Sequence, residues 1–182
     1  FRTTVMTELG GMAKAMVITA SRQGAVKYRQ AFEEYTKKKG YTDIHALVAF
    51  SGKVSLPDDP TEYTEAGMNG FPEDRLPKEF DGDYQVLLVA NKYQTGFDQP
   101  KLCAMYVLKK LKGVSAVQTL SRLNRICPPF EKKTFVLDFV NTYEEITNAF
   151  APFFTTTLLS NSVTPTAIYD LEAQIDAYAV LD

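Results

Sequence analysis

The sequence has few of the residues from which many enzyme sites are built. It contains one histidine, His45, and two cysteines, Cys103 and Cys127, in 182 residues. A single histidine gives no support for a Ser/His/Asp triad, a Cys/His pair or a zinc cluster, and two cysteines are too few for a disulfide framework. We therefore expect a reducing, cytoplasmic setting and no metal held by this chain.

Several segments that would define a class of protein are also absent. No apolar run is long enough to cross a bilayer, and the N-terminus does not resemble a signal peptide. The Gly-x-x-x-x-Gly-Lys-Ser/Thr phosphate loop and an Asp-Glu pair at the end of an apolar strand are missing, as is a nuclease-like cluster of acids with a lysine. We expect this chain alone neither to hydrolyse ATP nor to cleave DNA. Because it begins at Phe1, we expect it to be part of a longer protein.

The composition is that of an ordinary globular domain, with 45% hydrophobic and 23% charged residues and a net charge of −2. Charge is unevenly distributed, because residues 14–39 and 101–133 are rich in Lys and Arg whereas residues 58–83 are acidic. Residues 138–182 contain acids but no Lys or Arg. These blocks are either solvated faces or a basic surface for phosphates opposite an acidic one.

Five short apolar runs alternate with helical patterns, which predicts an α/β domain with a mainly parallel central sheet flanked by helices. The predicted strands are 15–19, 46–50, 86–90, 102–107 and 134–139. The predicted helices are 22–39, with an apolar stripe of Ala25, Tyr28, Phe32 and Tyr35, then 114–125, and 142–150, which starts with a Thr142/Glu145 capping box.

Two segments do not fit this alternation. Residues 55–83 are rich in Pro, Asp, Glu and Gly, and we expect a long irregular insertion there with one helical turn near 77–80. After Pro152 a polar stretch, 155–166, precedes an amphipathic helix at 167–181. We therefore expect a domain over 1–155, and a linker with a short helix over 156–182 that leads to a further domain.

The spacing Gln118, Arg122, Arg125 is the most informative pattern in the chain. At about 100° per residue, these three side chains lie in one stripe of the predicted helix 114–125, and Val117 and Leu120 lie on the opposite side, toward the sheet. Guanidinium groups are permanently charged and bind phosphate oxygens in a bidentate way. The alternative is a solvated basic helix face.

A second segment, VANKYQTGFDQP at 89–100, strengthens the phosphate-binding interpretation. Gln118-x-x-x-Arg122-x-x-Arg125 resembles motif VI of superfamily 2 helicases, and Thr95-Gly96-Phe97-Asp98 resembles their motif V. The sequences of these segments are similar to the motor (R) subunit of type I restriction endonucleases. The same holds for KAMVITASRQGAVKY at 14–28, ALVAFSG at 46–52 and TFVLDFVN at 134–141. Ser121 and Asn124 stand where many helicases have glycine, which departs from the general motif.

The resemblance implies a second RecA-like domain, which supplies groups to ATP held by a first RecA-like domain. It implies that Arg125 is an arginine finger, Arg122 a second contact to the γ-phosphate and Gln118 a positioning group. Gly96 and Asp98 would also face the nucleotide, although Asp98 could instead stabilise a turn. The cofactors implied are ATP and Mg²⁺ in the full-length subunit, with neither bound tightly by this chain.

The resemblance also implies contacts to the backbone of double-stranded DNA. We predict Thr95, Ser21, Arg22, Ser51 and Gly52 as these contacts, because small hydroxyl residues and loop amides at strand ends bind phosphate without reading bases. For the last four, N-capping or a simple turn is an equally good explanation. The implied partners are the first motor domain and the nuclease domain of the same polypeptide, and the methylation and specificity subunits of a prokaryotic restriction complex. Alternatives are the same domain of a type III restriction or repair helicase, or an inactive RecA-like interaction module.

Overall fold

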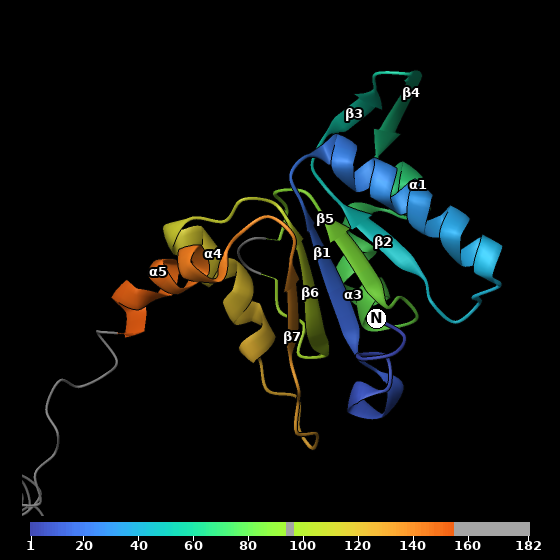
Figure 1. Ribbon diagram of the computed structural model, residues 1–182. Helices are drawn as coiled ribbons and strands as arrows, with labels where there is room; N and C mark the ends of the chain where they lie inside the picture. The colour runs from blue at the N-terminus through green and yellow to red at the C-terminus, as the bar shows by residue number, and fades with distance from the viewer. Residues whose placement is uncertain (94–96, 155–182) are drawn as a thin grey trace, which may run out of the picture. The chain divides into compact units, whose positions relative to one another are not determined.

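The computed structural model describes residues 1–93 and 97–154 and contains a five-stranded parallel sheet (Figure 1). The strands are β1 (Lys14–Thr19), β2 (Ala46–Ala49), β5 (Val86–Val89), β6 (Leu102–Leu108) and β7 (Phe135–Asp138). They lie in the order β2-β5-β1-β6-β7, and every neighbouring pair is parallel. All five predicted strands are confirmed, with ends that differ by one residue.

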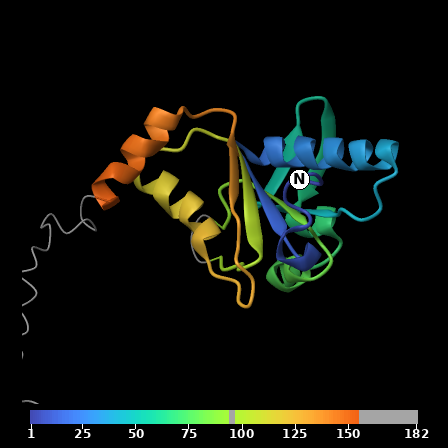
Figure 2. The same ribbon diagram turned by 60° about the horizontal axis from the view of Figure 1, so that its bottom comes forward.

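Helices cover both faces of this sheet, so the predicted three-layer α/β architecture with a parallel central sheet is confirmed (Figures 1 and 2). Successive residues of a strand point to opposite faces. On one face, Val48 and Leu88 pack with Ala25 and Val26 of α1 (Arg22–Lys39). On the other face, Leu47 and Leu87 share a cluster with residues of α3 (Leu76–Asp81) and α4 (Gly113–Leu120).

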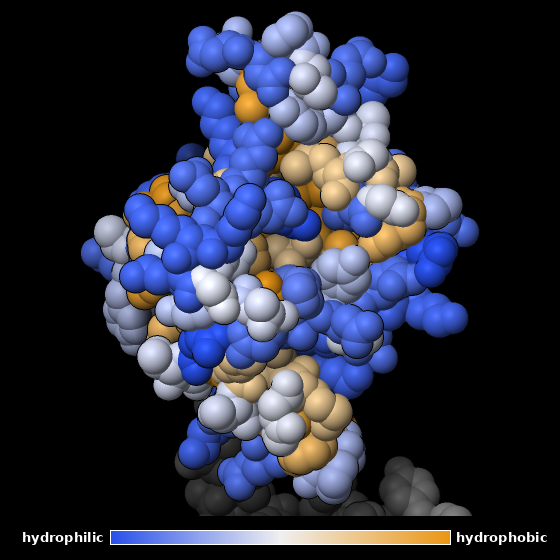
Figure 3. All heavy atoms as spheres, turned by 90° about the vertical axis from the view of Figure 1, so that its right-hand side faces the viewer, coloured by the Kyte–Doolittle hydropathy of each residue, from blue (hydrophilic) through white to orange (hydrophobic). Residues whose placement is uncertain are grey.

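Helix α1 has the predicted bounds, but its buried face differs from the predicted stripe. Ser21 caps its first turn, and Gly40 ends it with a φ of 66°. Ala25 and Val26 are buried and Phe32 packs against them, whereas Tyr28 and Tyr35 are 48% and 54% exposed. The tyrosines were misplaced because a hydroxyl-bearing ring lies as readily on a solvated helix face as in a core. Figure 3, which views the molecule from the right-hand side of Figure 1, shows a mainly hydrophilic surface with smaller apolar patches.

The prediction of an irregular insertion over 55–83 was wrong. The segment contributes the antiparallel hairpin of β3 (Lys53–Leu56) and β4 (Asp59–Thr64), then α2 (Glu65–Asn69), a 3₁₀ turn at Glu73–Arg75, and α3. Only the helical turn at 77–80 was predicted, and it lies within α3. These elements are too short to show a periodicity, but they are stabilised by tertiary burial, since Leu76 and Phe80 have no exposed surface.

Helix α5 (Tyr143–Phe154) begins with the predicted capping box. The backbone N–H of Thr142 donates to Glu145 at 2.9 Å, and that of Glu145 donates to the Thr142 hydroxyl at 3.2 Å. The chain divides into two compact units, Phe1–Ala149 and Phe150–Asp182, and the sheet lies in the first. The predicted segments 155–166 and 167–181 lie outside the described residues. Within 1–93 and 97–154, no helix is long and apolar enough to span a membrane.

Candidate functional site

The segment with Gln118, Arg122 and Arg125 is not the single helix that the spacing predicts. Helix α4 ends at Leu120, residues Ser121–Asn124 form a 3₁₀ helix, and Arg125 is extended with φ −65° and ψ 126°. The prediction of one α-helix over 114–125 was therefore wrong. The tighter 3₁₀ turn also changes the angle between successive side chains, so the predicted stripe does not apply to Arg122 and Arg125.

The buried side of this segment also differs from the prediction. Ala116, Thr119 and Leu123 are the buried residues, and Leu120 packs against the core only in part. Val117 is half-buried and belongs to no core cluster. The segment is thus anchored by small and branched residues three or four positions apart, which lets it lie close to the sheet.

The predicted nucleotide-binding side chains nevertheless lie together. A single open cavity of about 460 Å³ is lined by Phe97, Asp98, Gln118, Ser121, Arg122, Asn124 and Arg125. Four of these residues were predicted from the sequence, and they come from two segments of the chain, the one that follows β5 and the one that follows β6.

Arg122 is the more firmly held of the two arginines. Its Nη1 donates a 2.7 Å hydrogen bond to the carbonyl oxygen of Phe97. Burial, and then the charge of Arg125, lower the pKa of its guanidinium. Its Nε is buried and has no hydrogen-bond partner among the described residues. One part of this guanidinium therefore holds the protein together, and another part remains available for an acceptor.

Arg125 is held loosely. Its Nε lies 3.4 Å from Oδ1 of Asp98, and the two side chains are 61% and 67% exposed. An exposed ion pair of this kind contributes little to stability, because water and salt screen it. The guanidinium can therefore leave Asp98 for a stronger anion without a large cost in folding free energy.

The lining of the cavity fits a tetrahedral oxyanion. Two guanidinium groups and the amide of Gln118, which is exposed on α4, supply several N–H donors, and the buried Nε of Arg122 lacks an acceptor. The same lining does not fit a resident metal ion, since Asp98 is its only carboxylate. Across the described part of the chain, no group of three His, Cys, Asp or Glu side chains could hold a metal.

Three of the predicted DNA contacts form a second cluster at the ends of β1 and β2. Nη1 of Arg22 donates to the carbonyl oxygen of Ser51 at 3.1 Å. Gly52 has a φ of 74°, and a Cβ there would lie 3.2 Å from Nη1 of Arg22. The hydroxyl of Ser21 is already used, because it accepts the backbone N–H of Gly24 at 3.0 Å as the cap of α1. Thr95 and Gly96 lie outside the described residues.

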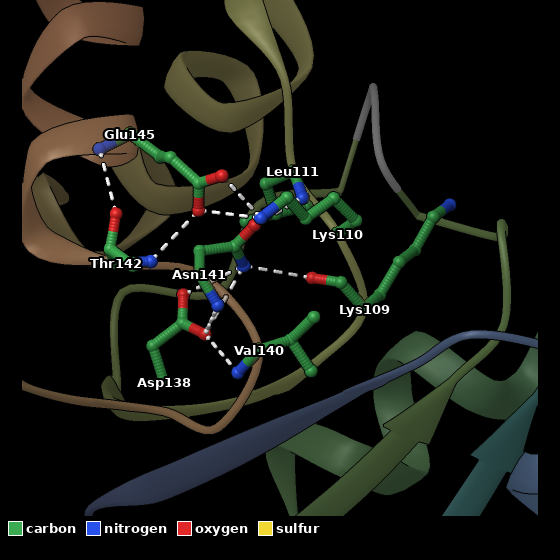
Figure 4. Close-up of polar contacts among 8 residues, drawn as sticks. All are labelled: Lys109, Lys110, Leu111, Asp138, Val140, Asn141, Thr142 and Glu145. Atoms are coloured by element: carbon green, nitrogen blue, oxygen red, sulfur yellow. Dashed lines mark hydrogen bonds and ion pairs between the residues drawn. The ribbon is translucent and has the colours of Figure 1, made fainter.

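The polar contacts that hold the connection between β6 and α4 were not predicted from the sequence (Figure 4). Asn141 donates from Nδ2 to the carbonyl oxygen of Lys109 and accepts from the backbone N–H of Leu111, both at 2.9 Å. Asp138 accepts from the backbone N–H of Asn141 at 2.8 Å. Asp-x-x-Asn after a strand is a turn signal that could have identified this network. It fixes the chain just before the helix that bears Gln118.

Comparisons with known proteins find similarity to type I restriction enzyme subunits. Residues 60–141 match the family model described as type I restriction enzyme subunit R domain 3. A putative type I restriction enzyme MjaIXP endonuclease subunit of Methanocaldococcus jannaschii is 30% identical over 77% of this chain and 13% of that protein. The type I restriction enzyme HindI endonuclease subunit of Haemophilus influenzae is 24% identical over 74% of this chain and 13% of that protein.

A solved structure, the C-terminal part of the Fun30 ATPase domain, is also similar. It is 12% identical, with a TM-score of 0.45, over 75% of this chain and 39% of that one. The chain spans only 13% of the length of the restriction subunits named above. The resemblance to type I restriction enzyme R subunits, predicted from the sequence, is confirmed by the family model and these restriction subunits.

Proposed function

We propose the following function for a chain that is related to the R subunits of type I restriction enzymes: it is the second motor domain of an ATP-dependent double-stranded DNA translocase. The observation that carries this proposal is the convergence of Gln118, Arg122 and Arg125 on one cavity beside Asp98. An interaction module that binds no nucleotide has no need of two guanidinium groups directed at the same open space.

In this proposal the chain completes an ATP site whose phosphate loop lies in a first motor domain. ATP bound there supplies the phosphoryl group that is transferred to water. Arg125 exchanges its loose pairing with Asp98 for phosphate oxygens and acts as an arginine finger. Arg122 keeps its bond to Phe97 while the rest of its guanidinium binds the phosphate, and Gln118 orients the groups around it.

The DNA side of the proposal depends on the cluster of Arg22, Ser51 and Gly52. Arg22 is exposed, so its guanidinium can bind a backbone phosphate while the loop after β2 approaches the same strand through Gly52. Such contacts carry no sequence information. Thr95 is proposed as a further phosphate contact. The partners proposed are the remaining domains of the same polypeptide and the methylation and specificity subunits of a restriction complex, in a prokaryotic cytoplasm.

The test is ATP hydrolysis by the full-length subunit, measured with and without duplex DNA. We expect hydrolysis that depends on duplex DNA of any sequence, and none from this chain alone with ATP and Mg²⁺. A full-length subunit whose rate of ATP hydrolysis is the same with and without duplex DNA would contradict the proposal. Turnover by this chain alone, with contaminating enzymes excluded by an Arg125→Ala sample prepared in parallel, would contradict it as well.

A further inference from the structure

A buried carboxylate ties the acidic insertion to the segment that follows β5. Glu65 is the first residue of α2 and has no exposed surface. Its Oε2 accepts two hydrogen bonds of 2.8 Å, from the backbone N–H of Phe50 at the end of β2 and from Nζ of Lys92. Lys92 also donates to Glu73 at 2.6 Å. Two acids of the insertion therefore hold one lysine of the neighbouring segment.

The segment around Lys92 has an unusual backbone. Asn91 and Tyr93, on either side of Lys92, have φ values of 58° and 61°. This left-handed conformation is unfavourable for a residue such as Tyr93, though Asn tolerates it better, and it persists only where surrounding contacts impose it. Here the contacts are the two acids on Lys92, a 2.6 Å hydrogen bond from Lys109 to Asn91, and a contact between the rings of Tyr93 and Phe97, whose centroids lie 4.5 Å apart at an interplanar angle of 42°.

Burying the Glu65–Lys92 ion pair between α2 and the segment after β5 carries a desolvation cost. Burial raises the pKa of the Glu65 carboxyl, and hydrogen bonding to Lys92 opposes that shift. Oε1 of Glu65 is buried without a partner among the described residues. An apolar contact would attach α2 to the sheet at a lower desolvation cost. What an apolar contact could not do is fix the direction of Lys92, and with it the backbone of its two neighbours.

We propose that Glu65, assisted by Glu73, is a positioning residue that holds Lys92 and so fixes the backbone of residues 91–93, which sets the affinity for duplex DNA. The inference rests on the proposed function, in which Thr95 contacts a DNA phosphate and Asp98 faces the nucleotide. The exit of the same segment is held by Arg122 through the Phe97 carbonyl. The acidic insertion thereby acts on the proposed nucleotide and DNA contacts, although none of its residues lines the cavity that contains Arg122 and Arg125.

The test uses the full-length subunit with Glu65→Gln, Lys92→Met, the double variant, and Glu73→Gln. Glu73 is half exposed, so its replacement removes one hold on Lys92 even if the Glu65 variant fails to fold. The matched control is Glu62→Gln, which lies in the same insertion but pairs with Lys53 at 2.8 Å. Two readouts are needed: amide hydrogen exchange of the peptide over 86–98, and the dissociation constant for a labelled duplex at fixed salt.

We expect faster exchange in that peptide and about tenfold weaker duplex binding for Glu65→Gln and Glu73→Gln but not for Glu62→Gln. The double variant should bind DNA no more weakly than Lys92→Met, since the residues act through one contact. Faster exchange with unchanged DNA affinity, or no change in exchange, overturns the inference. The proposed function fails separately if the wild type binds duplex DNA but its ATP hydrolysis does not respond to it. A wild type that binds no duplex overturns both.

Discussion

Nη1 of Arg122 lies 2.7 Å from the carbonyl oxygen of Phe97, so the 3₁₀ helix after α4 is bonded directly to the chain that follows residues 94–96. This contact gives Arg122 a structural role that Arg125 does not share. The two arginines, which look equivalent in the sequence, should therefore respond differently to substitution.

Arg122→Ala should lose both stability and activity. A hydrogen bond to a charged donor contributes about 1.5–3 kcal/mol, and its loss leaves a part-buried carbonyl of Phe97 without its partner. We expect the free energy of unfolding to fall by roughly this amount and DNA-dependent hydrolysis to fall as well. Urea denaturation and steady-state hydrolysis on the same preparation measure the two effects. Wild-type stability in this variant would mean that the contact is not maintained in solution.

Phe80→Ala should destabilise the domain even though residue 80 lies in the acidic insertion. Phe80 has no exposed surface, and its ring centroid lies 6.1 Å from that of Phe97. Removing a buried phenylalanine costs about 3–5 kcal/mol through lost burial and the cavity left behind. Thermal or urea unfolding measures the loss. The control is Phe139→Ala, an aromatic residue that is 61% exposed, and equal effects of the two changes would contradict the buried placement.

Lys14 should make stability depend on pH on the alkaline side. Its side chain is 3% exposed and donates to the carbonyl oxygens of Gly82 and Tyr84 at 2.9 and 2.7 Å. Burial, and then the charge of Lys101, lower its pKa from 10.5 to about 8. Between these values the unfolded chain binds more protons than the folded one, so the free energy of unfolding rises with pH, by at most about 3 kcal/mol from this group.

Lys14→Met should remove this part of the pH dependence, whereas Lys27→Met, at an exposed position of α1, should preserve it. Denaturation curves at several pH values from about 7 to 10 give the comparison. Parallel pH profiles for wild type and Lys14→Met would show that Lys14 keeps its ordinary pKa in the folded protein.

Arg22→Ala should weaken binding of the full-length subunit to duplex DNA equally for unrelated sequences. A lost phosphate contact also lowers the slope of log affinity against log salt by about one. Binding titrations at several salt concentrations measure both effects. Lys38→Ala, an exposed lysine near the far end of α1, is the control. A change in preference among DNA sequences would contradict contact to the backbone alone.

The parts of the fold that can be predicted from the sequence are those in which the local pattern of apolar and polar residues matches the residues that are buried. Strands buried on both faces read as apolar runs, and α1 carries both of its end signals, Ser21 and Gly40. The strands and helices of the insertion were not predicted, because these short elements depend on burial of Leu76 and Phe80, which a short acidic stretch does not reveal. Likewise, Glu65 looks like a surface acid in the sequence, since its partner Lys92 lies 27 positions away.

The cavity that contains Arg122 and Arg125 was likewise predictable only in part. Residue types and their order predict that Gln118, Arg122, Arg125 and Asp98 meet, and they line one cavity. The helical angle that suggested this does not apply, because α4 gives way to a 3₁₀ helix at Ser121. Where α4 ends depends on burial of Leu123 and on the Phe97 carbonyl, which are tertiary contacts and leave no periodic signal.

Arg125→Ala is the sharpest test of the motor assignment. Its side chain is 61% exposed and its contact to Asp98 is long, so its removal should leave the melting temperature of the domain unchanged within error. In the full-length subunit it should abolish ATP-driven translocation and slow DNA-dependent hydrolysis by about 10³–10⁵, the range typical of arginine fingers. Arg125→Lys should restore little, because an ammonium group cannot bind two phosphate oxygens in a bidentate way. Lys133→Ala, another exposed cation, is the control and should behave as wild type in both assays. Near-normal hydrolysis by Arg125→Ala would refute the finger assignment, and a clear drop in melting temperature would mean that Arg125 is needed for the fold instead.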